Sequence, residues 1–181
     1  MLLRKINSVL SLITGLLLLD HAIFFSVWMI MRGSIAKSAP VLPRVLVALT
    51  VVHAILSVVI LIRNRKSKDA EKSDCKDYPK LNASTYIQRI SGVLMLVLLG
   101  LHIAGSINHF QPQMLHVIMH PIFFAIALVH TGFSTSKALV TLGVGNATVV
   151  KVVDVIVKLI CAGTLIASVI GFYLCLFVGV A

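Results

Sequence analysis

Charged residues are scarce in this sequence of 181 residues. They make up 12% of the chain, and only six residues are acidic, whereas a typical soluble domain carries about a quarter of charged residues. Segments of about ten residues with alternating polarity, which membrane β-barrels show, are also missing. Hydrophobic residues make up 59% of the chain, and the mean hydropathy is +1.03. The composition therefore predicts an all-α integral membrane protein.

Cysteine is rare as well. The three cysteines, Cys75, Cys161 and Cys175, form neither a CxxC nor a CxxCH pattern. The spacing therefore predicts neither a disulfide framework nor covalently attached haem.

Five apolar stretches reach the ~20 residues that a membrane-spanning helix needs. We predict five transmembrane helices in a single domain, residues 1–181, with bounds at about 8–30, 43–62, 86–106, 114–135 and 152–178. Prolines and glycines stand between these stretches, as expected of connecting segments. The first stretch is too long for the core of a signal peptide, so we expect it to remain as helix one.

Lysine and arginine are unevenly distributed between the predicted loops. Thirteen fall on the side that holds the N-terminus, including eight between residues 63 and 89, and three fall on the other side. This predicts a cytoplasmic N-terminus, a cytoplasmic loop at 63–85 and an external C-terminus. The net charge of +10 follows from these loops and is not interpreted as a nucleic-acid footprint. The charged loop is either a solvated connection or a docking surface for a partner subunit.

Four of the seven histidines lie well inside the hydrophobic stretches, one on each of the first four helices. They are His21, His53, His102 and His130. An ionisable side chain in lipid is costly and usually faces the bundle interior with a partner, yet almost no carboxylate is available there. Haem iron accepts two histidines, one from each side, and helical bundles hold such cofactors between facing helices. We therefore predict two haem b groups in an up-and-down four-helix bundle with a fifth helix beside it.

The depth of each histidine predicts how the four pair. At about 1.5 Å per residue, His21 and His102 lie toward the outer side, His130 lies toward the inner side and His53 is central. Helices one and three lie on one diagonal of such a bundle, and helices two and four on the other. The predicted pairs are His21 with His102 and His53 with His130.

Other interpretations of the histidines remain open. His116 and His130 are fourteen residues apart, a spacing found in cytochromes that carry two ligands on one helix, although no second helix has a matching pair. His116 and His120 share a helix face and could bind a metal, but no carboxylate lies near them in the sequence. The alternative from a different functional class is a small multi-pass transporter or assembly protein without haem.

Helix three opens with a distinctive stretch, Gln88-Arg89-Ile90-Ser91-Gly92-Val93, and carries Leu101-His102 near its far end. In this the chain resembles the five-helix dihaem cytochrome b membrane anchor of succinate dehydrogenase and fumarate reductase complexes. That family has a Gln-Arg-(Ile/Val)-(Ser/Thr)-Gly opening followed by a ligand histidine at similar spacing. It also has one ligand on each of its first four helices and none on the fifth.

The resemblance implies partners, a substrate and a location. The partners are a flavoprotein with FAD and an iron–sulfur subunit, both on the cytoplasmic side of a bacterial inner membrane. The chain would exchange electrons with menaquinone or another quinone and would not itself catalyse the dicarboxylate step. Arg89 and Ser91 would contact haem propionates or quinone.

The position of the quinone site has two candidate locations. Oxidation of quinol releases protons, so the site needs ionisable groups near water, and histidine accepts protons near neutral pH. Asp20, His116 and His120 are candidates on the outer side, which we favour. The inner side near Arg89 and Ser91 is the alternative.

Overall fold

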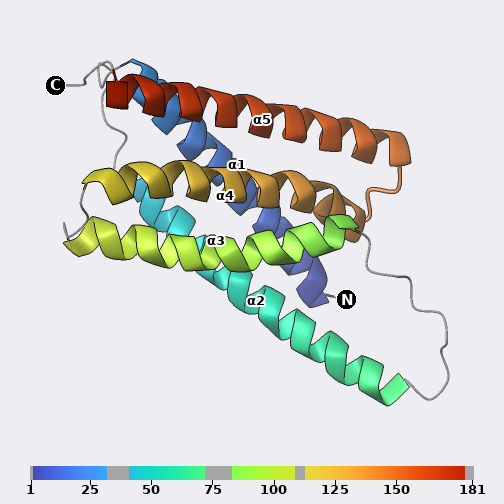
Figure 1. Ribbon diagram of the computed structural model, residues 1–181. Helices are drawn as coiled ribbons and strands as arrows, with labels where there is room; N and C mark the ends of the chain where they lie inside the picture. Colours follow the sequence, from blue (N-terminus) through green and yellow to red (C-terminus); the bar gives the residue numbers. More distant parts are fainter. Residues whose placement is uncertain (1, 32–40, 72–82, 109–112, 178–181) are drawn as a thin grey trace.

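The structure is a computed structural model that describes residues 2–31, 41–71, 83–108 and 113–177, and in these ranges it contains helices and no strand. The helices are α1 (Leu2–Ile30), α2 (Val41–Glu71), α3 (Ala83–Asn108), α4 (Gln113–Leu142) and α5 (Ala147–Phe177) (Figure 1). The predicted all-α class is confirmed.

All five helices are long and apolar enough to cross a membrane. Their outward faces carry large hydrophobic side chains, such as Leu16, Val93 and Leu159, which are 64–68% exposed. Exposed apolar area of this extent is unfavourable in water, whereas lipid chains solvate it. The helices are therefore compatible with a multi-pass membrane protein.

Several predicted helix bounds are wrong, because the helices continue past the apolar stretches. α2 runs to Glu71 and α3 begins at Ala83, so the predicted loop at 63–85 is helical at both ends, and its middle, 72–82, lies outside the described residues. α4 ends at Leu142 rather than 135, and α5 begins at Ala147 rather than 152. Lys, Arg, Ala and Glu are good helix formers, so a helix continues where hydropathy has already fallen.

The turn between α4 and α5 lies in the stretch that the sequence marks as a break. Gly143 has a φ of 98°, a conformation that glycine adopts without steric cost. The amide of Val144 donates to the Leu139 carbonyl at 3.1 Å, which closes the end of α4. Asn146 Oδ1 accepts the amides of Thr148 and Val149 at 3.0 and 3.2 Å and so caps the start of α5.

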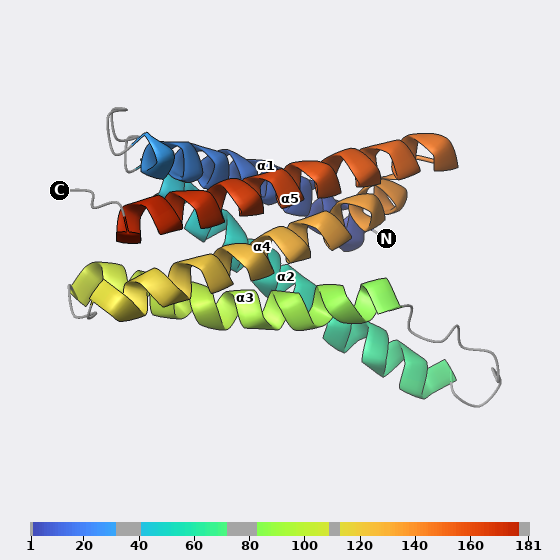
Figure 2. The same cartoon turned by 45° about the horizontal axis from the view of Figure 1, so that its top comes forward.

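Successive helices run in opposite directions (Figures 1 and 2). The helices α1, α3 and α5 begin at the same end of the bundle, which we call the N-terminal end. The other end of the bundle is called the opposite end. α1 packs against α2, α4 and α5, and α4 also packs against α3 and α5. Within the described residues, no Cα atom of α2 lies within 8 Å of α3 or α4, and the same holds for α1 and α3. The first four helices therefore form a ring that is open between α2 and α3.

The most tightly packed region lies where α1, α4 and α5 meet. Leu19, Leu128 and Cys161 form its buried hydrophobic cluster. Toward the opposite end, Ser26 and Ser168 are almost fully buried, and their hydroxyls lie 2.7 Å apart. The core thus sits on one side of the ring, and the interior of the ring is left for a cavity.

Candidate cofactor site

A cavity that is partly open to the outside lies between α1, α2, α3 and α4. Its lining is mostly apolar or hydroxyl-bearing, and all four histidines of the hydrophobic stretches contribute to it: His21, His53, His102 and His130. One histidine comes from each of the four helices that form the ring.

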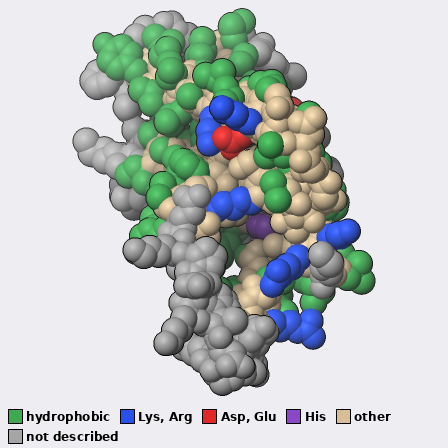
Figure 3. Space-filling view, turned by 90° about the vertical axis from the view of Figure 1, so that its right-hand side faces the viewer, with side chains coloured by type: hydrophobic (Ala, Val, Ile, Leu, Met, Phe, Trp, Pro, Cys, Tyr) green, Lys and Arg blue, Asp and Glu red, His purple; other side chains and the backbone are tan. Residues whose placement is uncertain are grey.

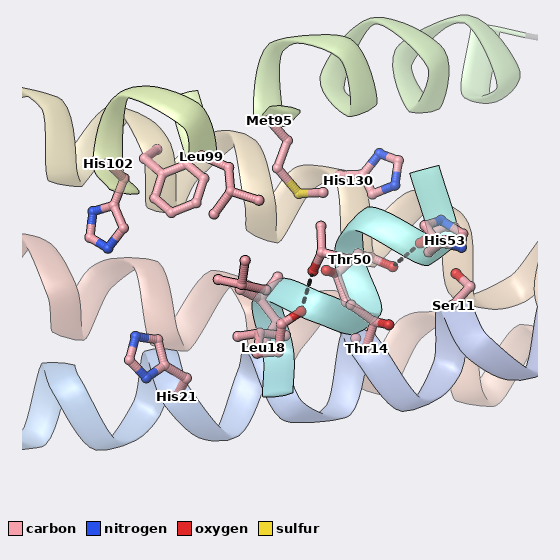
Figure 4. Close-up of a pocket in the computed structure, with 16 residues that line it drawn as sticks. Ser11, Thr14, Leu18, His21, Thr50, His53, Met95, Leu99, His102 and His130 are labelled. Carbon is pink, nitrogen blue, oxygen red and sulfur yellow. Dashed lines mark hydrogen bonds between the residues drawn. The ribbon is translucent and has the colours of Figure 1, made fainter. Parts of the chain in front are cut away.

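The histidines occupy the two ends of this cavity (Figure 4). His21 and His102 point toward one another at one end, and His53 and His130 lie at the other. Leu18, Thr50, Met95 and Leu99 lie between the two groups. The His102 ring also stacks on Phe123, with ring centroids 5.5 Å apart. The histidines thus lie as two groups at the two ends of the cavity, and ligation of haem by His21 with His102 and by His53 with His130 stays a prediction.

His130 is held against the first turns of α3. Its Nδ1 lies 3.0 Å from the Gln88 carbonyl oxygen and 3.2 Å from Ser91 Oγ. Gly92 leaves room for the ring, because a Cβ at this position would lie 3.0 Å from His130 Cε1. The stretch Gln88–Gly92 of α3 thus contacts and positions a histidine that belongs to another helix.

The hydrogen-bonding capacity of His53 is less completely used than that of His130. It lies against the backbone of Asn7 on α1 and close enough to His130 for an electrostatic interaction. Its Nδ1 is buried and has no hydrogen-bond partner among the described residues. A buried polar atom without a partner costs about 1–3 kcal/mol, so it calls for an explanation such as a ligand.

A polar contact lies beside this pair, nearer the N-terminal end. Lys137 Nζ donates to Thr85 Oγ1 at 2.8 Å and to Gln88 Oε1 at 3.0 Å. Figure 3 views this end of the molecule and shows Lys and Arg side chains around a hollow, in which a histidine is visible. Lys and Arg side chains therefore gather at this end of the molecule.

The other predicted site residues are placed differently. Arg89 is exposed, whereas Ser91 is buried and contacts His130, so the role of Ser91 at propionates or quinone stays a prediction. Asp20 is exposed and does not line the cavity. His116 and His120 belong to the first turns of α4, where the structure describes no side chains. A quinone site on that side stays a prediction too.

The histidines do not form one metal-binding cluster. In the part of the chain that the structure describes, no group of three or more His, Cys, Asp or Glu side chains could hold a metal ion.

Sequence reasoning missed the roles of Gln88 and Gly92. Both stand in the stretch that carries the resemblance, so the signal was present, but the stretch does not reveal its partner on α4.

No protein family model, curated protein or solved structure matches this chain. The functional argument therefore rests on the site and on the resemblance at Gln88–Val93.

Proposed function

We propose that the chain is a haem b-containing membrane anchor. It transfers electrons between a membrane quinone pool and cytoplasmic flavoprotein and iron–sulfur subunits of a complex like succinate dehydrogenase or fumarate reductase. One observation carries the proposal: four histidines from four different helices line one cavity, two at each end. The complex and its partners rest on the resemblance at Gln88–Val93.

The shape of the site supports a large planar cofactor. The lining between the two histidine groups is mostly apolar or hydroxyl-bearing, as is typical of cofactor sites. The ring is open between α2 and α3, and α2 approaches only α1 among the described helices. A planar cofactor between the helices would fill this opening. The buried His53 Nδ1 has no hydrogen-bond partner among the described residues, which supports a ligand at this imidazole.

The residues of the chain supply three things to such a cofactor. His21 and His102 would hold one haem, and His53 and His130 would hold the other. Apolar side chains between the pairs exclude water, which lowers the local dielectric constant and so tunes the redox potential. Bound haem supplies the ability to accept and release one electron.

The N-terminal end carries the positive charge that anionic groups need. Seven described Lys and Arg side chains lie in this half of the bundle and one in the other half. Lys137, which donates to Gln88 Oε1, and the exposed Arg89 would hold haem carboxylates or a quinone. By the positive-inside rule, this end faces the cytoplasm, where the two soluble subunits would dock.

One observation favours the alternative of a haem-free transporter or assembly protein. His130 already has hydrogen-bond partners on α3, and a purely structural histidine would have such partners too. A haem-free protein would need a separate contact for each of the four histidines, whereas two haems would engage all of them.

An absorption spectrum of the purified full chain, expressed with haem supply, tests the proposal. We expect the sharp reduced α band of six-coordinate b haem and a pyridine haemochrome yield near two haems per chain. The matched control is a variant with all four cavity histidines replaced by alanine, which should fold and show no band. A folded wild-type chain without the band would overturn the proposal and favour the transporter class.

A further inference from the structure

The contacts of His130 define which of its two nitrogens carries a proton. The Gln88 carbonyl oxygen, 3.0 Å from Nδ1, can only accept a hydrogen bond. Nδ1 must therefore be the protonated nitrogen, and in the neutral ring Nε2 keeps its lone pair. A lone pair on Nε2 is what an iron ligand requires.

Ser91 supports the same arrangement. Its hydroxyl lies 3.2 Å from the Gln88 carbonyl and 3.2 Å from His130 Nδ1. The hydroxyl hydrogen goes to the carbonyl of its own helix, and an Oγ lone pair faces the Nδ1 proton. Because Ser91 is only 5% exposed, water does not compete for this contact.

Gly92 makes the approach of the ring possible. A Cβ there would lie 3.0 Å from Cε1 and 3.3 Å from Nδ1 of His130, tighter than ordinary van der Waals contact. The ring would have to move away from the Gln88 carbonyl, and the hydrogen bond would lengthen. Glycine is thus needed for a close approach between an imidazole and a helix backbone.

We propose that the Gln88 carbonyl, Ser91 and Gly92 form a positioning site for His130, which we call the His130 seat. The seat fixes the tautomer and the plane of the imidazole and, through its hydrogen bonds, the electron density that His130 offers to the iron. Hydrogen bonds to the outer nitrogen of a ligand histidine increase its basicity. The seat therefore lowers the redox potential of the haem at the N-terminal end. This inference rests on the proposed haem ligation.

The test compares two glycines of the same helix. Gly92→Ala should alter only one of the two haems, changing its low-spin EPR signal and moving its midpoint potential to a more positive value. Gly100→Ala is the matched control, since a Cβ there would meet nothing within 4 Å, and it should leave both haems unchanged. A redox titration in the His21→Ala background, which should lack the other low-spin haem, assigns the affected one.

Ser91 provides a second variant that adds no volume. Ser91→Ala should raise the potential of the same haem, and Ser91→Thr, which restores a hydroxyl, should return it toward the wild-type value. If Gly92→Ala and Ser91→Ala leave both EPR signals and both potentials unchanged, the His130 seat is refuted while the haem assignment stands. A change of equal size in both haems would also refute it. A wild-type chain without haem would instead refute the proposed function.

Discussion

The distance between the two histidine pairs along α3 is the basis for a sharp prediction. Gly92 contacts His130 and so marks the level of that pair on α3. His102 belongs to the other pair and lies ten residues further along the helix. At about 1.5 Å per residue, the two levels are about 15 Å apart.

Helix α1 gives a second estimate of the same separation. The backbone of Asn7 lies against His53, and His21 follows fourteen residues later, which corresponds to about 21 Å. No single iron spans about 15–21 Å, because axial ligands lie on opposite sides of one metal atom. If the histidines ligate haem as proposed, each pair would hold its own haem, and the two haems should be lost independently.

We expect each single His→Ala variant at the cavity to reduce the low-spin haem content from two per chain to one. His21→Ala combined with His102→Ala should still leave one, because both changes affect the same iron. His21→Ala combined with His53→Ala should leave none. EPR integration of oxidised protein, together with the pyridine haemochrome yield, measures the content.

A variant at a histidine that is not a predicted haem ligand controls for effects on folding. His116→Ala should keep both low-spin haems. The pairing is wrong if His21→Ala with His102→Ala leaves none while His21→Ala with His53→Ala leaves one. If His116→Ala removes a haem and His130→Ala leaves both, the ligand assigned to α4 is wrong.

Three further predictions concern other parts of the molecule. Ser26→Ala and Ser168→Ala should each lower the free energy of unfolding by about 0.6–1.7 kcal/mol. The loss should be this small because the hydroxyl that remains still donates to its own helix backbone. A coupling energy above about 3 kcal/mol between the two positions in a double-mutant cycle would contradict this. A reporter fused after Ser67 should be cytoplasmic and one at the C-terminus external, and protease protection that places both on the same side would refute the orientation. Asp20→Asn should slow quinol oxidation more than Arg89→Ala does in haem-replete protein; the reverse order would move the quinone site to the N-terminal end.

The helical class could be predicted from the sequence because apolar stretches of about 20 residues have few structural alternatives. The ends of the helices could not be predicted in this way. α2 continues to Glu71 and α5 starts at Ala147, since helix propensity continues where hydropathy falls. The turn at Gly143 could be predicted, because glycine signals a local backbone conformation that depends on no distant partner.

The candidate site could be predicted only as far as one histidine per helix and its depth. His21, His53, His102 and His130 line a common cavity in the structure, while haem binding stays a prediction. The seat of His130 joins residues 42 positions apart, and which faces of α3 and α4 meet depends on packing between whole helices. Residue types alone therefore could not reveal that Ser91 contacts a histidine.

The position of the core explains why a fifth helix without a histidine is present. A four-helix bundle normally buries its apolar side chains in the middle, but here the cavity occupies that space. The buried cluster of Leu19, Leu128 and Cys161 lies instead between α1, α4 and α5. α5 thus supplies apolar burial that the ring cannot provide for itself. α2 and α3 each pack on only one described neighbour. A cofactor in the cavity would therefore add contacts between these two helices and the rest of the bundle. Haem loading should then stabilise the folded state by mass action.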